Sequence, residues 1–240
     1  MITYFIDGID IRSAYGVHIS ASNGILGKPK TKERQREEYL NLHGSYVDLG
    51  MTRYADREIS LSCFIKATTK IDFINKVDEF TDLINAPGLH RLEIALDGQK
   101  VLFFEVYNKN AIELAKKWSG GTQVGTFALR LIEPCPVKRV YHGYISDRNL
   151  PVELSVMGGS DLNVFWGDTT HDFDVENFPL SHQYDSDQEE FYIIIAGTID
   201  EITDVSATNM ELHEVLTGRT SIIWNNGVGL LWNNGEQMLY

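Results

Sequence analysis

One segment of this chain has the spacing of a helix, and most of the rest has the spacing of strands. Over residues 71–86 the apolar side chains recur every three or four positions, which places them on one stripe of an amphipathic helix. Thr69, with Asp72 three residues later, fits the start of this helix, and Pro87-Gly88 ends it. A chain with one clear helix must build its core from sheets, so the sequence predicts a mainly-β protein.

The strand-like runs on both sides of the helix show partial alternation of apolar and polar residues, as in REISLSCFIKA and GTFALRLIEP. Asp97-Gly98 lies between two of them and is a hairpin signal. The segment Asn110–Trp118 is a second, shorter helix candidate that also fits a crossing between strands. We therefore predict that residues 1–140 form a β-barrel or split barrel with the helix 71–86 packed on it.

Charge divides the chain into two parts. Residues 1–142 hold 19 Lys and Arg and 17 Asp and Glu, whereas residues 143–240 hold 2 and 17, a net charge of −15. This asymmetry favours two units, and strand-like runs at 151–157, 162–166 and 191–196 predict a small β-sandwich over residues 145–205. The run FYIIIAG is apolar on both faces, which predicts a buried central strand. The acidic part should repel nucleic acid.

The C-terminal end repeats Trp-Asn-Asn-Gly, at Trp224 and again at Trp232, before it ends at Tyr240. Asn and Gly accept the positive φ of tight turns, so residues 206–240 are predicted to be a β-hairpin meander. Isolated hairpins are marginally stable in water, so this one must pack on something. The side chains of Trp224, Trp232 and Tyr240 are therefore the candidate contacts, either for a partner protein or for a glycan.

The strand at residues 57–67, the helix that ends in Pro87-Gly88 and the strands after it resemble the N-terminal domain of siphophage distal tail proteins. The resemblance covers a little over half the chain. It implies a virion protein, made in the bacterial host cytoplasm, that forms a homo-oligomeric ring, a hexamer, between the tail tube and the baseplate or receptor-binding proteins. DNA would only pass through the central channel. Tail-tube and tail-completion proteins share this fold and are an alternative.

A second resemblance is to PKD-like sandwich modules. Trp166-Gly167-Asp168, His182-Gln183-Tyr184 and the strand at residues 191–197 match their signature, with Thr169 where a Gly is usual. Distal tail proteins often carry a carbohydrate-binding second domain. The resemblance therefore leaves a further alternative, a host-adhesion module of the tail tip that binds glycan.

Every second residue from 28 to 36 is basic. If this segment is extended, the basic side chains project from one face. Such a face fits an arm in solvent or against a neighbouring subunit, and also a surface facing DNA. A channel that DNA crosses quickly should not bind phosphates, so we favour the arm. The residues concerned are Lys28, Lys30, Lys32, Arg34 and Arg36.

Motifs that carry chemistry are sparse. The stretch GDTTHDFD, residues 167–174, fits a loop in which Asp168 caps its own turn, or a calcium site. The sequence contains no nucleophile elbow, HExxH pair or phosphate loop. Cys63 and Cys135 lack metal-ligand spacing and are expected to be reduced structural thiols. We predict no enzyme activity, cofactor, metal site or membrane partner.

Overall fold

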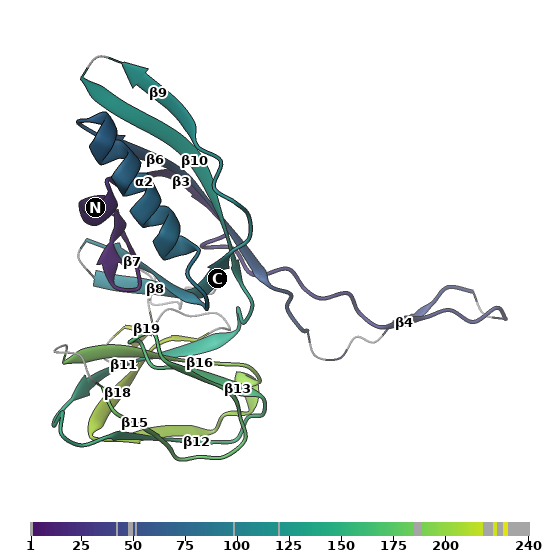
Figure 1. The fold of residues 1–240 in the computed structure, drawn as a ribbon. Coiled ribbons are helices and arrows are strands. Elements are labelled where there is room, and N and C mark those ends of the chain that lie inside the picture. Colours follow the sequence, from purple (N-terminus) through teal and green to yellow (C-terminus); the bar gives the residue numbers. More distant parts are fainter. Residues whose placement is uncertain are drawn as a thin grey trace.

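The computed structural model of the chain describes residues 2–41, 43–47, 50, 52–97, 99–119, 121–184, 189–217, 223–224 and 228–229. The fold is mainly β, which confirms the predicted class (Figure 1). Two large hydrophobic cores lie at opposite ends of the body, and a thin two-stranded arm projects from its side. Among the described residues, no helix is both long and apolar enough to cross a membrane.

An eight-stranded antiparallel sheet surrounds the first core, in the order β2-β1-β7-β8-β10-β6-β3, with β9 pairing β10. Its two halves meet only where Leu131 and Ile132 of β10 pair with Asn108 and Tyr107 of β8. The path is open, because β2 and β3 end it without pairing each other. The strands are β1 (Ile2–Ile6), β2 (Ile9–Asp10), β3 (Val17–Asn23), β6 (Arg57–Ala67), β7 (His90–Leu96), β8 (Gln99–Asn108), β9 (Ala115–Ser119) and β10 (Thr122–Glu133).

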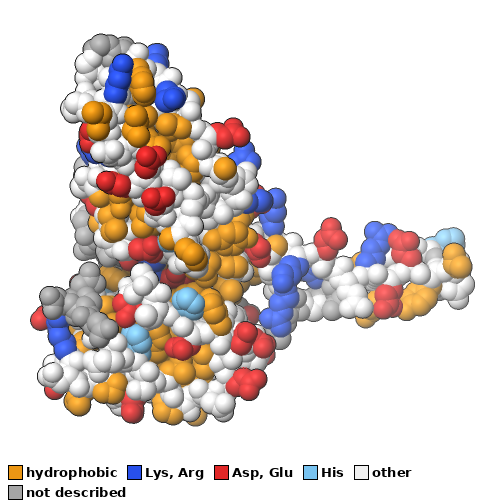
Figure 2. Space-filling view, in the orientation of Figure 1, with side chains coloured by type: hydrophobic (Ala, Val, Ile, Leu, Met, Phe, Trp, Pro, Cys, Tyr) orange, Lys and Arg blue, Asp and Glu red, His pale blue; other side chains and the backbone are white. Residues whose placement is uncertain are grey.

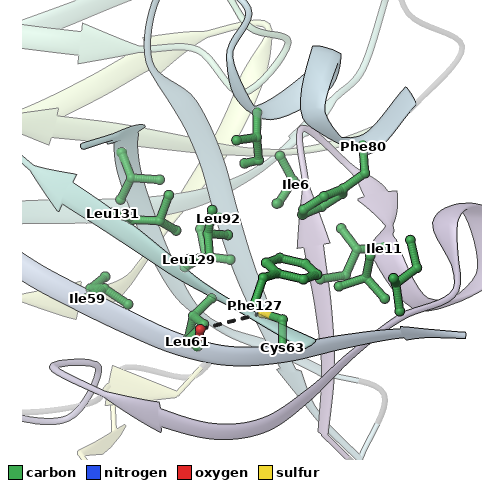
Figure 3. Packing of buried hydrophobic residues seen from close by; sticks show 14 of the residues in the cluster. Ile6, Ile11, Ile59, Leu61, Cys63, Phe80, Leu92, Phe127, Leu129 and Leu131 are labelled. Atoms are coloured by element: carbon green, nitrogen blue, oxygen red, sulfur yellow. Dashed lines mark hydrogen bonds between the residues drawn. The ribbon is translucent and has the colours of Figure 1, made fainter. Parts of the chain in front are cut away.

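The predicted helix is α2 (Lys70–Ile84), which packs on β6 and β10. Its N-terminus is capped as expected, since the Asp72 N–H donates to Thr69 Oγ1 at 3.1 Å. The buried stripe includes Phe80, whose ring lies 5.8 Å from that of Phe127. Figure 3 shows Phe80 and Phe127 pointing toward the aliphatic side chains of β1, β6 and β10. A short helix that the sequence analysis did not foresee, α1 (Ile11–Tyr15), contributes buried Ile11 to the same core.

The second helix candidate, Asn110–Trp118, is wrong as a helix. Its C-terminal part is β9, which pairs β10 from Ala115↔Thr126 to Ser119↔Thr122. Strand β8 pairs only the C-terminal end of β10. The N-terminal part of β10 pairs β9 instead. Gly125 is required at this point, because a Cβ there would lie 2.7 Å from Cζ of Phe73.

The second core lies between two antiparallel sheets, β14-β13-β16-β11-β18 and β15-β12-β17, which form a sandwich. In its central strand β16, Ile193 and Ile195 face this core while Ile194 faces the eight-stranded sheet. This confirms the prediction of a strand buried on both faces. The strands are β11 (Lys138–Ile145), β12 (Val152–Met157), β13 (Leu162–Phe165), β14 (His171–Val175), β15 (Leu180–His182), β16 (Glu190–Ala196), β17 (Asp204–Thr208) and β18 (Met210–Thr217), with the 3-10 turn η1 (Ile199–Glu201) before β17.

The division of the chain into domains at 1–140, 145–205 and 206–240 stays a prediction. The hydrogen-bonded strands of the sandwich extend past two of those limits. Strand β11 begins at Lys138, and β17 and β18 continue the sandwich to Thr217. The described strands of the sandwich therefore begin before residue 145 and end after residue 205, the limits predicted for it.

The arm consists of residues 24–56, between β3 and β6. Near its root the Lys32 N–H donates to the Arg53 carbonyl at 2.8 Å, and the Ala55 N–H donates to the Lys30 carbonyl at 2.7 Å. Further out, β4 (Arg36–Glu37) pairs β5 (Tyr46–Val47). The arm is therefore an irregular antiparallel ribbon that leaves the body of the molecule (Figure 1).

We expect Phe80→Ala to lower the free energy of unfolding by about 3–5 kcal/mol, because the lost ring leaves a cavity between α2 and the sheet. Ile71→Ala on the exposed face of the same helix is the control, and should change it by less than about 0.5 kcal/mol. Urea unfolding measures both. Equal losses would show that α2 does not pack as described.

Candidate functional site

The C-terminal contact residues lie largely outside the described part of the chain. Strand β19 (Ile223–Trp224) pairs β20 (Val228–Gly229), with Trp224 opposite Val228, so the first Trp-Asn-Asn-Gly unit joins two paired strands. Trp232 and Tyr240 fall outside the described residues, as does the side chain of Trp224. Their role as contacts for a protein or a glycan stays a prediction.

The carboxylates of residues 167–174 point to different partners. Asp168 accepts hydrogen bonds from the Thr170 N–H, at 3.1 Å, and from His182 Nε2, at 2.9 Å. Asp172 accepts one from Nε1 of the buried Trp166 at 2.8 Å. The role predicted for Asp168, capping its own turn, is confirmed. Within the described residues, no three His, Cys, Asp or Glu side chains are grouped closely enough to hold a metal ion.

Thr169 has a φ of 74°, in the left-handed region that glycine adopts without strain. A Gly at this position would avoid the strain that Thr169 carries. Gly167, with a φ of 103°, is needed for another reason, since a Cβ there would lie 2.8 Å from Nη1 of Arg91. This turn therefore brings the sandwich into contact with the eight-stranded sheet.

Hydrogen bonding makes Asp168 a stronger acid than usual. Burial alone would raise its pKa, but the hydrogen bonds from His182 and Thr170 outweigh burial and lower the pKa from 3.8 to about 2. The ring of His182 also stacks on Trp166, with 4.4 Å between centroids. The ionised carboxylate thus holds β15 and the turn after β13 together.

Because the pKa of Asp168 is depressed by folding, its contribution is present above pH 3.8 and is lost as the pH falls toward 2. Asp168→Asn should lower the free energy of unfolding by about 2 kcal/mol at pH 7. Its difference from the wild type should shrink between pH 4 and pH 2, as measured by thermal unfolding. The exposed Asp174→Asn is the matched control and should track the wild type. A constant difference across this range would contradict the assignment.

Arg91 of β7 joins the two parts of the molecule. Its Nε donates to Glu105 Oε1 at 2.6 Å, and its Nη1 and Nη2 donate to the carbonyls of Tyr192 and Phe165 in the sandwich. Beside it, the ring of Phe103 packs on Tyr192 with 4.3 Å between centroids. A third hydrophobic cluster fills this joint, and its buried members are Phe103, Val140, Phe165, Ile194 and Ala196.

His90, next to Arg91 in β7, contributes to the joint through Asp7. Its Nδ1 lies 2.7 Å from Oδ2 of Asp7, and its Nε2 lies 3.1 Å from the carbonyl of Ala86. A carboxylate and a carbonyl both accept, so the protonated ring, in which both nitrogens donate, satisfies both contacts. The hydrogen bond to Asp7 is the main reason why the pKa of His90 is raised. Oδ1 of Asp7 in turn accepts from the Arg91 N–H at 2.7 Å.

Because the pKa of His90 is raised by folding, its contribution is complete below pH 6.5 and is lost as the pH rises through the raised pKa. We therefore expect the free energy of unfolding to fall as the pH rises above 6.5, and His90→Gln to remove this dependence. Urea unfolding from pH 6 to pH 9 tests it, with the exposed His171→Gln as the control. The interpretation fails if His90→Gln keeps the wild-type slope.

The root of the arm is fixed by a buried ionic cluster. Glu133, with no exposed surface, pairs with Arg57 Nε at 2.9 Å and with Lys138 Nζ. Nη1 of Arg57 also lies within 2.6–3.2 Å of three carbonyls at the arm root, those of Gly24, Ile25 and Gly27. Burial lowers the pKa of Lys138. The cluster ties the first strand of the sandwich, the last strand of the eight-stranded sheet and the arm to one point.

The two cysteines are free. Burial raises the pKa of Cys63 to about 12 and also raises that of Cys135. Both thiols are therefore poor nucleophiles, as structural cysteines are.

Three exposed features distinguish the surface. A groove of about 470 Å³ separates the open edges of β1 and β3 and is lined by both strands and α1. At the far end of the sheet, Trp118 is 41% exposed, and the ammonium groups of Lys70 and Lys116 lie over its ring at 5.3 and 5.4 Å. The arm is the third feature, with basic and hydrophobic side chains along it (Figure 2). Of these, sequence analysis identified only the basic residues of the arm.

No protein-family profile and no curated protein matches the sequence. One similar solved structure is the crystal structure of the Dit protein (gp 19.1) of phage SPP1, described as a paradigm of the hub adsorption apparatus in phages that infect Gram-positive bacteria. The two chains are 10% identical, and the comparison covers 82% of this chain and 98% of that one, with a TM-score of 0.40. A likeness this distant assigns no function.

Proposed function

We propose that this protein is a structural subunit of a phage or prophage tail, which assembles side by side with copies of itself into a ring at the distal end of the tail. The observation that carries the proposal is the open sheet. Strand β3 ends it on one side, and on the other side β2 covers only Phe5 and Ile6 of β1, so the rest of the β1 edge faces β3 across the groove. Unpaired N–H and C=O groups on a sheet edge pair readily with another chain, and a ring of copies satisfies every such edge.

The ionisable side chains favour a structural role over a catalytic one. Asp168 and His182 hold a turn, Arg91 and Glu105 hold the joint, and Glu133 holds the arm root. Each of these groups is engaged by partners that position backbone. The sequence resemblance to distal tail proteins supports the same function, and from it come the proposed hexamer and the channel that DNA would cross.

The patch around Trp118 gives the proposed ring a second kind of contact. It lies at the tip of the β9–β10 hairpin, at the end of the molecule opposite the sandwich (Figure 1). Ile71 follows Lys70 in the first turn of α2 and is 73% exposed, and the ammonium groups of Lys70 and Lys116 lie over the Trp118 ring. Exposed apolar surface bounded by charge is typical of protein contacts, so we propose that a tail-tube or baseplate protein binds this end.

Ser20→Pro should abolish ring formation while leaving the subunit folded. Ser20 is the extra residue of a β-bulge in β3, exposed and outside the register with β6, and proline is tolerated at bulges of edge strands. Proline lacks the N–H that an added strand needs. Light scattering and negative-stain electron microscopy measure the assembly, and thermal unfolding checks the fold.

Ser20→Ala is the control, because it removes the hydroxyl that donates to the Ser62 carbonyl and keeps the N–H. It should assemble like the wild type. A wild-type protein that stays monomeric at every concentration would overturn the proposal. Long tubes in place of single rings would favour the tail-tube alternative, and a tryptophan-fluorescence response to polysaccharide by a monomer would favour the adhesin.

A further inference from the structure

The outer part of the arm exposes apolar side chains that nothing in its own chain covers among the described residues. Leu40 is fully exposed, and Tyr39 and Tyr46 are 51% and 70% exposed. A two-stranded ribbon of this kind is marginally stable in water by itself. Its length and direction place it far from both hydrophobic cores (Figure 1). The arm therefore needs a surface supplied by another molecule.

The inner part of the arm is cationic. Residues 28–36 and 52–56 carry six Lys and Arg against two Asp and Glu. The hydrogen bond from the Lys32 N–H to the Arg53 carbonyl sets these two residues opposite each other in the ribbon. Lys28, Lys30 and Lys32 are exposed, and Figure 2 shows basic side chains at the arm root. The surface that the arm needs should therefore be acidic.

We infer that the arm binds the sandwich of a second copy of this chain. The inference rests on the proposed function, since it states which surface of the neighbour the ring contact uses. Residues 138–217, which form the sandwich, carry 16 Asp and Glu against three Lys and Arg. Its surface also exposes Leu150 and Met157, at 54% and 62%, as apolar partners for the outer part of the arm.

The geometry of one chain favours a contact between copies over a contact within it. Among the described residues, the arm and its own sandwich share a groove of about 570 Å³ at the root, where Lys32 and Arg53 line one side and Gly197 and Asp200 line the other. Beyond the root the ribbon points away from the sandwich (Figure 2). The outer arm therefore reaches a sandwich only when a neighbour brings one, and the contact joins two different surfaces, as a closed ring requires.

Nucleic acid is a weaker fit than a protein surface. Glu33, Glu37 and Glu38 lie among the basic residues of the arm, and Arg36 is engaged by Glu38. Interspersed carboxylates repel phosphates but can pair with the few basic groups of a protein partner. Exposed ion pairs contribute little each, so the arm's charges should mainly orient the neighbour and make its association depend on salt.

The test uses the full chain, with assembly measured by light scattering at 50 mM and 500 mM NaCl. The arm variant Lys28→Glu/Lys30→Glu/Arg34→Glu changes exposed basic residues that do not line the root groove, and should weaken association at least tenfold at low salt. The sandwich variant Glu153→Lys/Glu176→Lys/Asp204→Lys changes three exposed carboxylates that do not line the root groove and should do the same. A chain that carries both the arm and the sandwich substitutions should associate again, because a negative arm then meets a positive sandwich.

The control Thr31→Glu/Gln35→Glu adds negative charge at alternate positions of the same segment and should leave association near the wild-type value. Thermal unfolding checks that each variant folds. Rings that persist in the arm variant would overturn the arm contact and leave the proposed ring standing. A monomeric wild type would overturn the proposed function itself. Arm-dependent binding of double-stranded DNA would show that the arm's ligand is nucleic acid.

Discussion

The buried carboxylate of Glu133 is the constraint on which the architecture depends. Removing a charge from water is costly unless it is paired, and here Arg57 and Lys138 both pair with it. The three residues come from the start of β6, the end of β10 and the start of β11. The ring of Phe104 lies under both cations, at 5.5 and 4.6 Å. Two cores and the arm are thereby anchored at one place, with Pro134-Cys135-Pro136 as the short crossing between them.

The packed cores of the molecule stabilise its fold. We propose that the open strand edges and exposed surfaces instead serve its assembly with other copies. The joint is packed on both sides, since Phe103 of β8 and Ile194 of β16 are fully buried between the two sheets. The edges of β1 and β3, the hairpin tip at Trp118 and the arm remain open. Stability and assembly therefore depend on different residues, and variants of one class should leave the other property intact.

Sequence patterns predicted the parts of this fold that depend on near neighbours. The spacing over 71–86 predicted α2, and the run around Ile194 predicted a buried strand, since both are periodic signals. The local spacing of Asn110–Trp118 fits a helix or a crossing between strands, and pairing with β10 decides that its C-terminal part is a strand. Arg57 and Glu133 are 76 residues apart, and no local pattern relates them. The candidate contacts predicted at the C-terminus fall largely outside the described residues, whereas alternating charge did indicate an extended arm.

In the proposed ring, the arm binds a neighbour more readily because its root is held in one position. Arg57 fixes the carbonyls of Gly24, Ile25 and Gly27, so the ribbon leaves the body in one direction. A flexible arm would lose conformational entropy on binding a neighbour, and that loss would cancel much of what weak surface ion pairs contribute. An arm whose direction is set in the free subunit avoids most of this cost. In the proposed ring, the buried ion cluster sets the direction in which the arm leaves the subunit. The exposed charges of the arm select the surface of the neighbour that the arm binds.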